Sequence, residues 1–395
     1  MNDNRLHDVF IVDALRTPTG RYRGAFSGIR ADHLAAVVLQ ALVDKTGLEA
    51  AAVDDVIMGN VTQVGEQSAN IARTALLSAG WPEVIPGLTI DRKCGSGEEA
   101  VHVAAGMIAA GIHDVVIAGG AENMTRVTMG SNRSIMGEAF GKPVLDRFEM
   151  VSQGEAAERI ADKWNLSRQD LDAFGAESQA RASKARKSGY FDREIVPVDI
   201  RSWIDEGYEH EGPEVLSQDE TIRPGTTIEK LATLKTPFRE NGKISAGNAS
   251  QISDGASALV LMSGNALRQY ALKPRARLRA MTTVGSDPTL MLTGPIAATQ
   301  KVLDQAGLST DDIDLFEVNE AFAPVPMIWM QEHNISTNRL NVNGGAIALG
   351  HPLGASGARI MTTLLHELER RDATLGLQSI CCAGGMATAT IIERV

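Results

Sequence analysis

The chain has 395 residues, of which 44% are hydrophobic and 22% are charged, and its formal net charge is -11. That length exceeds one compact core of ordinary size, so two or three domains or subdomains are expected. The acidic balance argues against general nucleic-acid binding, because a phosphate backbone attracts clustered Lys and Arg.

The first residues and the cysteine content favour a cytoplasmic location. The stretch "MNDNRLHDVFIVDALRTPTG" shows neither a secretory apolar region nor an Arg-rich transit pattern. No window approaches the roughly 18 apolar residues of a membrane span. The cysteines, Cys94, Cys381 and Cys382, are too few for a disulfide framework, and their odd number fits a reducing compartment.

Residues 42–56 belong to an internal repeat. The stretch "LVDKTGLEAAAVDDV" aligns without a gap with "VLDQAGLSTDDIDLF" at 302–316, so that Gly47 and Gly307 coincide. Each copy is typical of a helix end, a Gly C-cap, a short loop and a buried strand. The sequence therefore predicts two similar α/β halves, each with a mostly buried sheet. Chance similarity between two helix–Gly–strand units is the alternative.

Cys94 follows an apolar strand, "IPGLTID", and precedes a helix predicted from about Gly97 to Ala110. A thiol at a helix N-terminus feels the positive end of the helix dipole, which favours the thiolate. A histidine base elsewhere in the chain would complete an activated nucleophile. The alternative is a structural cysteine, because a buried cysteine usually packs as a small hydrophobe.

The stretch 125–249 lacks the clean periodicity of the segments on either side. It contains a polar helix, before which Ser167 and Asp170 have the pattern of an N-terminal capping pair. We expect a loop domain that covers a ligand site, because loops on a rigid scaffold commonly carry function. A surface insertion without a role is the alternative. The expected domains are 1–124 with about 250–270, then 125–249, then 271–395.

Polar residues in the C-terminal half lie at the ends of apolar strands or within a glycine-rich loop. Asn319 follows the strand of "FEVNEAF", where open α/β sheets bind ligands, and its amide is a plausible donor to an oxyanion. His351 lies in "NGGAIALGHPLGASG", which matches neither the P-loop nor the dinucleotide pattern. No His or Cys partner stands at metal-ligand spacing from it. Cys381 and Cys382 end a strand, where a thiol of tuned pKa can act as general acid or base.

Taken in order, these motifs resemble the thiolase family of 3-ketoacyl-CoA thiolases and acetyl-CoA acetyltransferases over essentially the whole chain. The matching stretches are "IVDALRTPTGRYRG" at 11–24, "CGSG" at 94–97, "SAGNASQISDGASA" at 245–258, "NEAF" at 319–322, "NGGAIALGHPLGASG" at 343–357 and "CCAGGM" at 381–386. The resemblance implies a duplicated α/β core, layered α-β-α-β-α, with a covering loop domain. It also implies an acyltransferase of fatty acid metabolism, such as β-oxidation, and a homodimer or homotetramer.

The resemblance also implies the roles of individual residues. Cys94 would take an acyl group from a 3-ketoacyl-CoA, and His351 would accept its proton. Cys381 would protonate the departing acetyl-CoA enolate, or deprotonate acetyl-CoA in the condensing direction. Asn319, through a water, would join His351 in holding one thioester oxygen, and the N–H groups of Cys94 and Ala383 would hold the other.

Coenzyme A is the implied substrate, together with acyl-CoA thioesters, and neither a permanently bound cofactor nor a metal is implied. The segment around Ala246, Gly247 and Ser250 resembles the one that lies along the pantetheine arm. Arg223 lies in the stretch that would receive the nucleotide end of CoA.

Four departures from the family pattern involve five positions. Asp91 stands where the family commonly has Asn, and Gln251 and Ala383 stand where it commonly has Gly. Ser152 and Gln153 replace the His-Met pair typical of acetoacetyl-specific biosynthetic enzymes. These departures bear on the acyl-chain preference and leave the core chemistry intact. The Ser152-Gln153 pair, together with a shorter preceding loop, favours acyl chains longer than acetoacetyl.

Three alternatives stay open at the level of sequence. A decarboxylating ketosynthase shares the duplicated fold, but it typically pairs its cysteine with two histidines, whereas Asn319 and Cys381 are present here. An acetoacetyl-CoA-specific biosynthetic enzyme would use the same residues. A non-catalytic acyl-CoA-binding homologue would not need Cys94, His351 and Cys381 together.

Overall fold

The computed structural model describes residues 8–209 and 212–395, and most of its helices and strands fall into two series. The N-terminal series is β1 (Val9–Arg16), α1 (Ala31–Thr46), β3 (Asp55–Gly59), α2 (Ile71–Ser78), β4 (Gly87–Ile90), α3 (Ser96–Ala109), β5 (Val115–Asn123) and β8 (Ser253–Ser263). The C-terminal series is β9 (Ala276–Gly285), α11 (Gly294–Ala306), β10 (Leu315–Val318), α12 (Pro324–His333), α14 (Ser356–Arg371), β11 (Leu375–Cys382) and β12 (Met386–Arg394).

The strands of both series join in one path whose order is β10-β11-β12-β9-β1-β8-β5-β3-β4. Each series contributes a parallel pair, β3 with β5 and β10 with β11, followed by antiparallel neighbours. From β1 outward the order is β1-β8-β5-β3, and from β9 outward it is β9-β12-β11-β10. The two runs correspond strand by strand, so that β1 matches β9, β8 matches β12, β5 matches β11 and β3 matches β10. The two series are therefore related as the duplicated sequence predicts.

Matching side-chain contacts support the duplication at the level of single residues. Gly47 and Gly307 cap α1 and α11 with φ values of 70° and 67°, a left-handed conformation that favours glycine. Asp54 accepts hydrogen bonds from the backbone N–H groups of residues 114 and 115, and Asp314 does the same for residues 374 and 375. Each aspartate fixes the start of the strand that pairs with its own, so the repeat predicted from sequence is confirmed.

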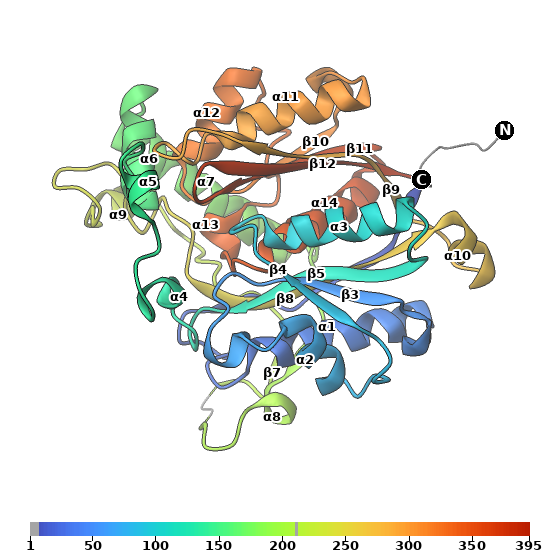
Figure 1. Cartoon of the computed structure of the whole chain (residues 1–395). Coiled ribbons are helices and arrows are strands. Elements are labelled where there is room, and N and C mark those ends of the chain that lie inside the picture. The colour runs from blue at the N-terminus through green and yellow to red at the C-terminus, as the bar shows by residue number, and fades with distance from the viewer. Residues whose placement is uncertain (1–7, 210–211) are drawn as a thin grey trace.

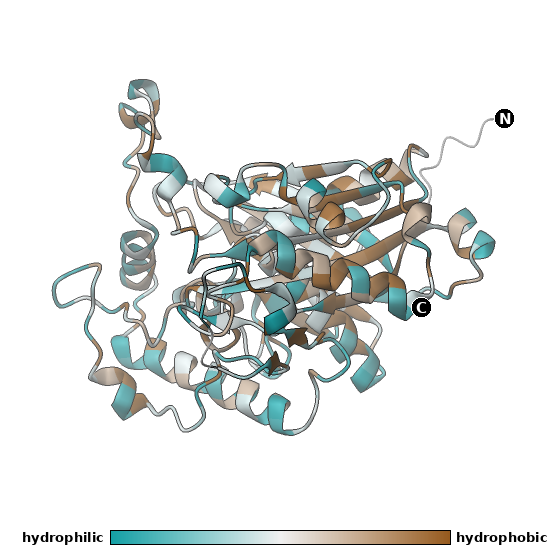
Figure 2. Ribbon diagram, turned by 90° about the horizontal axis from the view of Figure 1, so that it is seen from below, coloured by the Kyte–Doolittle hydropathy of each residue, from teal (hydrophilic) through white to brown (hydrophobic). Residues whose placement is uncertain are grey.

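The elements stack in five layers, α-β-α-β-α, as the resemblance implied (Figure 1). Helix α1 packs on β5 and β8, and α11 packs on β9 and β12. Helices α3 and α14 pack on each other between the two sheet halves. Figure 2 shows that hydrophobic residues concentrate in the strands and that hydrophilic residues gather on the outer helices. No helix within residues 8–209 and 212–395 is both long and apolar enough to cross a membrane.

The chain between β5 and β8 forms the loop-rich segment at one end of this core (Figure 1). Ser167 and Asp170 form the capping box that their spacing predicts, at the start of α7. Helix α7 packs on α9 and α13 (Ala346–Leu349), and α6 packs on α12, so this part of the segment lies against the C-terminal half. Val198, Ile200 and Leu216, from β6, α8 and β7, belong to the hydrophobic core of the N-terminal half. The predicted domain bounds remain a prediction. The elements of this segment are α4 (Ser131–Ser134), α5 (Lys142–Leu145), α6 (Gln153–Lys163), α7 (Arg168–Lys187), β6 (Val198–Asp199), α8 (Ile200–Trp203), β7 (Val215–Leu216) and α9 (Ile228–Ala232).

Candidate active site

Cys94 lies on a tight turn between β4 and α3. Lys93 has a φ of 51°, an uncommon value for a residue with a side chain, and it turns the backbone sharply before the helix. Ser96 fixes this turn, because its hydroxyl accepts a hydrogen bond from the Arg92 N–H at 2.8 Å and donates to the Lys93 carbonyl at 2.6 Å. The thiol is therefore held at the N-terminal end of α3, with 2% of the residue exposed.

Burial is the largest influence on the pKa of this thiol. It raises the pKa of Cys94 to about 11, whereas hydrogen bonds from the backbone N–H of Ala383, from its own N–H and from the Gln153 side chain lower that pKa by less. The helix-dipole argument favoured the thiolate, whereas a pKa of about 11 keeps the free thiol protonated at neutral pH. If Cys94 acts as a nucleophile, a base must take this proton during the attack.

The two other thiols lie at the end of β11 and face different surroundings. Cys381 is buried, and both its burial and the nearby Cys94 raise the pKa of the Cys381 thiol well above its ordinary value. Cys382 packs against the start of α3, because a Cβ placed on Gly95 would lie 2.7 Å from the Cys382 sulfur. Only glycine at position 95 leaves room for that sulfur, which indicates a packing role for Cys382.

Two serine hydroxyls, of Ser253 and Ser356, hold His351 in place, and the second of them also defines its tautomer. Its backbone N–H donates to the Ser253 hydroxyl at 2.7 Å. Its Nδ1 atom lies 2.5 Å from the Ser356 hydroxyl oxygen, and that hydroxyl donates its own proton to the Pro352 carbonyl at 2.8 Å. A hydroxyl has a single proton, so Nδ1–H must donate to Ser356 and the lone pair lies on Nε2. The basic nitrogen of His351 is therefore Nε2.

Asn319, directly after β10, lies beside that nitrogen. Its Nδ2 amide is 3.3 Å from His351 Nε2, a long contact that leaves the lone pair weakly engaged. Burial, and then the nearby Arg359, lower the pKa of His351 to about 3. The imidazole is therefore neutral at working pH and can accept a proton. Asn319 Oδ1 is buried and bonds to no side chain or backbone group of the described residues.

A cavity of about 610 Å³ brings most of the predicted residues together. Cys94 lies behind its wall, in a small buried cluster with Met124 and Leu353, and both of these line the cavity. Gln153 links the cavity to the nucleophile, because it lines the space and its side chain hydrogen-bonds the Cys94 thiol. The predicted residues that line the cavity are Gln153, Arg223, Ala246, Gly247, Ser250 and His351.

The outer part of the cavity is built around Gln251. Its Oε1 accepts from Arg223 Nη2 at 3.1 Å, and its Nε2 donates to the carbonyls of Thr221 and Ile347 at 2.9 Å each. The glutamine that departs from the family pattern thus holds the arginine predicted to meet CoA. Ser152 has a different place, because its hydroxyl caps α6 by accepting the N–H of Glu155.

Sequence reasoning missed several residues of this site, including Ser253, Ser356 and Met124. All three lie in or beside stretches that drew attention for other reasons, the first two within the motifs that carry the resemblance. Ser253 and Met124 have partners in remote parts of the chain, which no local spacing could have indicated, whereas Ser356 meets His351 within a single motif. Ser253, for example, meets His351 across 98 residues.

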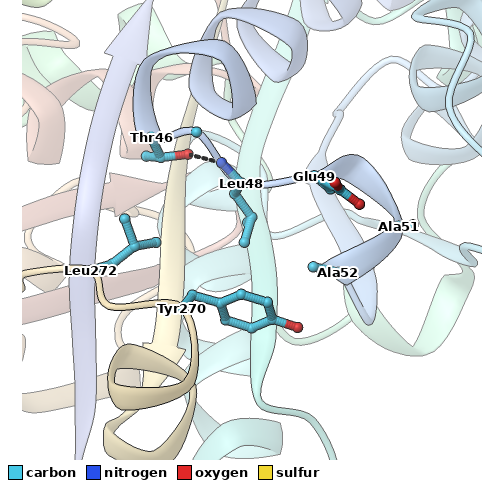
Figure 3. A pocket seen from close by; sticks show the side chains of 8 residues that line it. Thr46, Leu48, Glu49, Ala51, Ala52, Tyr270 and Leu272 are labelled. Carbon is cyan, nitrogen blue, oxygen red and sulfur yellow. Dashed lines mark hydrogen bonds between the residues drawn. The ribbon is translucent and has the colours of Figure 1, made fainter.

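A second hollow, of about 480 Å³, lies between the end of α1 and Tyr270 (Figure 3). Thr46, Gly47, Leu48, Ala51, Ala52 and Leu272 line it with Glu49 and Tyr270, so it offers neither a cysteine nor a histidine. Within residues 8–209 and 212–395, no group of three or more His, Cys, Asp or Glu side chains could hold a metal ion. The chemistry therefore concentrates in the cavity beside Cys94.

Comparisons with known proteins agree with the geometry. The family models that match are the thiolase N-terminal domain, over residues 9–265, and the thiolase C-terminal domain, over residues 272–394. The steroid 3-ketoacyl-CoA thiolase FadA6 of Mycobacterium tuberculosis is 44% identical, over 98% of this chain and 94% of its own length. The 3-oxoadipyl-CoA/3-oxo-5,6-dehydrosuberyl-CoA thiolase of Escherichia coli is also 44% identical, over 99% of this chain and 100% of its own. The crystal structure of the Bacillus anthracis acetyl-CoA acetyltransferase superposes with a TM-score of 0.90 at 38% identity, and each chain is covered completely.

Proposed function

The chain belongs to the thiolase family and is an acyltransferase with thiolase activity, and we propose that Cys94, His351 and Cys381 carry its chemistry. The observation that carries this proposal is the arrangement around one cavity. His351 lines it with a free Nε2 lone pair, and Cys94 lies behind it within reach of the Ala383 N–H.

In the first half-reaction, the Cys94 sulfur attacks the 3-keto carbon of a 3-ketoacyl-CoA while His351 Nε2 takes the thiol proton. Cys94 has a pKa of about 11 and His351 one of about 3, so both are neutral at rest and proton transfer must accompany the attack. The carbonyl oxygen gains negative charge, and backbone N–H groups such as that of Ala383 stabilise it.

Cleavage then breaks the bond between carbons 2 and 3 of the substrate, and its electron pair leaves as the enolate of acetyl-CoA. We assign the proton for carbon 2 to the Cys381 thiol, because its raised pKa keeps it protonated beside Cys94. Asn319, with a water on its buried Oδ1, joins His351 in stabilising the thioester oxygen of the enolate.

In the second half-reaction, the thiol of free CoA attacks the acyl group on Cys94. His351 first passes the proton that it took from Cys94 to the Cys381 thiolate, and its Nε2 then accepts the proton of the attacking CoA thiol. As the new thioester forms, the bond between the acyl group and the Cys94 sulfur breaks, and His351 returns this proton to Cys94. Coenzyme A is therefore a substrate in this account, and no bound cofactor takes part. In the reverse direction, Cys381 as thiolate removes a proton from acetyl-CoA, and the carbanion attacks acyl-Cys94.

For substrate range, we propose that the enzyme accepts acyl chains longer than acetoacetyl. Two observations support this. The residue that hydrogen-bonds the Cys94 thiol is Gln153, which belongs to the pair that replaces the His-Met pair of acetoacetyl-specific enzymes. Relatives of similar identity are named for steroid and 3-oxoadipyl substrates. Thiolysis kinetics across 3-ketoacyl-CoA chain lengths tests the proposal. Activity confined to acetoacetyl-CoA would reject it.

The assignment of Cys381 is tested by separating acyl exchange from carbon–carbon cleavage. Exchange between acetyl-CoA and labelled CoA needs only Cys94 and His351, whereas thiolysis also needs an acid for the enolate carbon. Cys381→Ala should therefore keep exchange and lose thiolysis by roughly 10²–10⁴-fold.

Cys382→Ala is the matched control, since its sulfur packs against Gly95, and both reactions should be largely retained. Selective loss of thiolysis in Cys382→Ala would exchange the roles of the two thiols.

We further propose a cytoplasmic enzyme that forms a homodimer or homotetramer. The reducing location is supported by three free cysteines, all buried. Sedimentation of the purified protein tests the oligomeric state, and a monomer would reject this part of the proposal.

A further inference from the structure

Two consecutive residues at the start of β8 hold two different segments of the cavity wall. Ser253 accepts the backbone N–H of His351, as described above. Asp254, which is fully buried, accepts the Thr125 N–H at 2.9 Å and the Thr125 hydroxyl at 2.6 Å. The backbone N–H of Met124 also hydrogen-bonds the Asp254 carboxylate. One strand end therefore positions both the proposed base and Met124.

Met124 belongs both to the buried cluster around Cys94 and to the wall of the cavity. It follows the last residue of β5, is 3% exposed, and shares a buried cluster with Cys94 and Leu353. It also lines the cavity together with His351 and Gln153. An acyl group on the Cys94 sulfur would therefore meet the Met124 side chain with its first carbons.

The backbone of this segment is anchored on both sides of Met124. The Asn123 side chain donates to the carbonyls of Phe26 and Ile29 at 2.9 and 2.8 Å. Arg126 pairs with Glu66 and, at 2.6 Å, with Asp205. With the Asp254 contacts, these bonds prevent the segment from moving aside when a bulky acyl group enters.

We propose that Met124 is a specificity-determining residue, whose side chain limits the bulk allowed on the carbon next to the carbonyl of the acyl group on Cys94. Asp254 is the positioning residue that holds this wall in place. The inference rests on the proposed function, because it takes Cys94 as the residue that carries the acyl group.

A second methionine supplies a contrast within the same cavity. Met129 also lines it, but it is 47% exposed and lies outside the cluster that contains Cys94. Met129 therefore meets parts of the substrate farther from the nucleophile. Branching next to the carbonyl should be sensed at Met124 and not at Met129.

The test compares two isomers, butyryl-CoA and isobutyryl-CoA, in exchange with labelled CoA. They have the same atoms and differ only in branching at the carbon next to the carbonyl. Met124→Ala should raise the isobutyryl-to-butyryl ratio of kcat/KM by about tenfold or more, the usual effect of one methyl group in a tight pocket. Met124→Leu, which conserves volume, should stay near the wild-type ratio, and Met129→Ala should leave the ratio unchanged.

Asp254 is tested by the same ratio, which a general loss of stability would not shift. Thr125→Val removes the hydroxyl bonded to Asp254 and keeps the N–H, so it should raise the ratio by less than Met124→Ala does. Asp254→Asn should act in the same direction if it folds.

An unchanged ratio in Met124→Ala that still exchanges butyryl-CoA would overturn the proposal, as would an equal shift in Met129→Ala. Failure of the proposed function is distinct from both, because the wild-type protein would then form no acyl group on Cys94.

Discussion

Glu98 offers a direct test of how burial controls charge beside the nucleophile. It lies in α3, one turn after Cys94, and is fully buried. The hydroxyls of Thr388 and Thr390 on β12 donate to its carboxylate at 2.6 and 2.5 Å. Desolvation outweighs these bonds and raises the pKa of Glu98 from 4.5 to about 7. We predict that Glu98→Gln removes a pH-dependent loss of stability.

The sign follows from the two pKa values. Below about pH 4.5 the carboxyl is protonated in both the folded and unfolded states, so it contributes no pH-dependent difference. As pH rises toward about 7, the unfolded state ionises first and the folded state loses stability relative to it. The gap between 4.5 and about 7 corresponds to roughly 3 kcal/mol, reached in full above pH 7. Glutamine does not titrate and avoids this loss.

Equilibrium urea unfolding at about pH 5 and about pH 8 measures the effect. The free energy of unfolding of Glu98→Gln, relative to wild type, should rise by roughly 2.5 kcal/mol between the two values, because a smaller part of the loss is already present at about pH 5. Any cost of the altered hydrogen bonds is the same at both pH values and cancels. Glu138→Gln, at an exposed position, is the control and should show no such change. A pH-independent difference for Glu98→Gln, or one of opposite sign, would refute the reasoning.

Three further predictions concern catalysis. Ser356→Ala removes the acceptor of the His351 Nδ1–H, which orients the imidazole. The loss of this one hydrogen bond should lower kcat for both exchange and thiolysis by roughly tenfold. An unchanged kcat would contradict an orienting role for Ser356. Asn319→Ala should lower kcat for thiolysis by about 10²–10³-fold, because a contact to the oxyanion is lost. A change in kcat that is smaller than the change in KM would count against this role. The lowered pKa of His351, about 3, predicts that kcat/KM does not change with pH down to about pH 5. The Glu98→Gln protein is used for this measurement, because glutamine at position 98 does not titrate. A fall in kcat/KM below about pH 6.5 would contradict a neutral imidazole.

The sequence predicted the parts of the fold that depend on local pattern. Gly47 and Gly307 marked equivalent helix ends because a left-handed cap favours glycine whatever surrounds it. Ser167 and Asp170 marked a helix start for a similarly local reason. The joining of the two halves through β1 and β9 was not predictable, because only two residue pairs make that contact, Phe10 with Arg277 and Ile11 with Ala276.

The candidate site also combines features that local sequence predicts with features that depend on the fold. The neighbours of Cys94 place it at a helix start, but they do not predict its ionisation, because burial by remote segments raises the pKa of the thiol. Ser356 lies five residues after His351 in the same motif, so their proximity could be expected. The tautomer of His351 could not be predicted, because it depends on the Pro352 carbonyl that accepts the Ser356 hydroxyl proton. The place of Met124 in the cavity wall could not be predicted from sequence, because Asp254, which holds it, lies 130 residues away along the chain.

The most direct test of the central claim is to locate the acyl group in the enzyme. The protein is incubated briefly with an acyl-CoA, quenched in acid and digested, and the peptides are weighed by mass spectrometry. The account predicts the acyl mass on the peptide that contains Cys94, and no such mass after Cys94→Ala. An acyl group on Cys381 or Cys382 would contradict it.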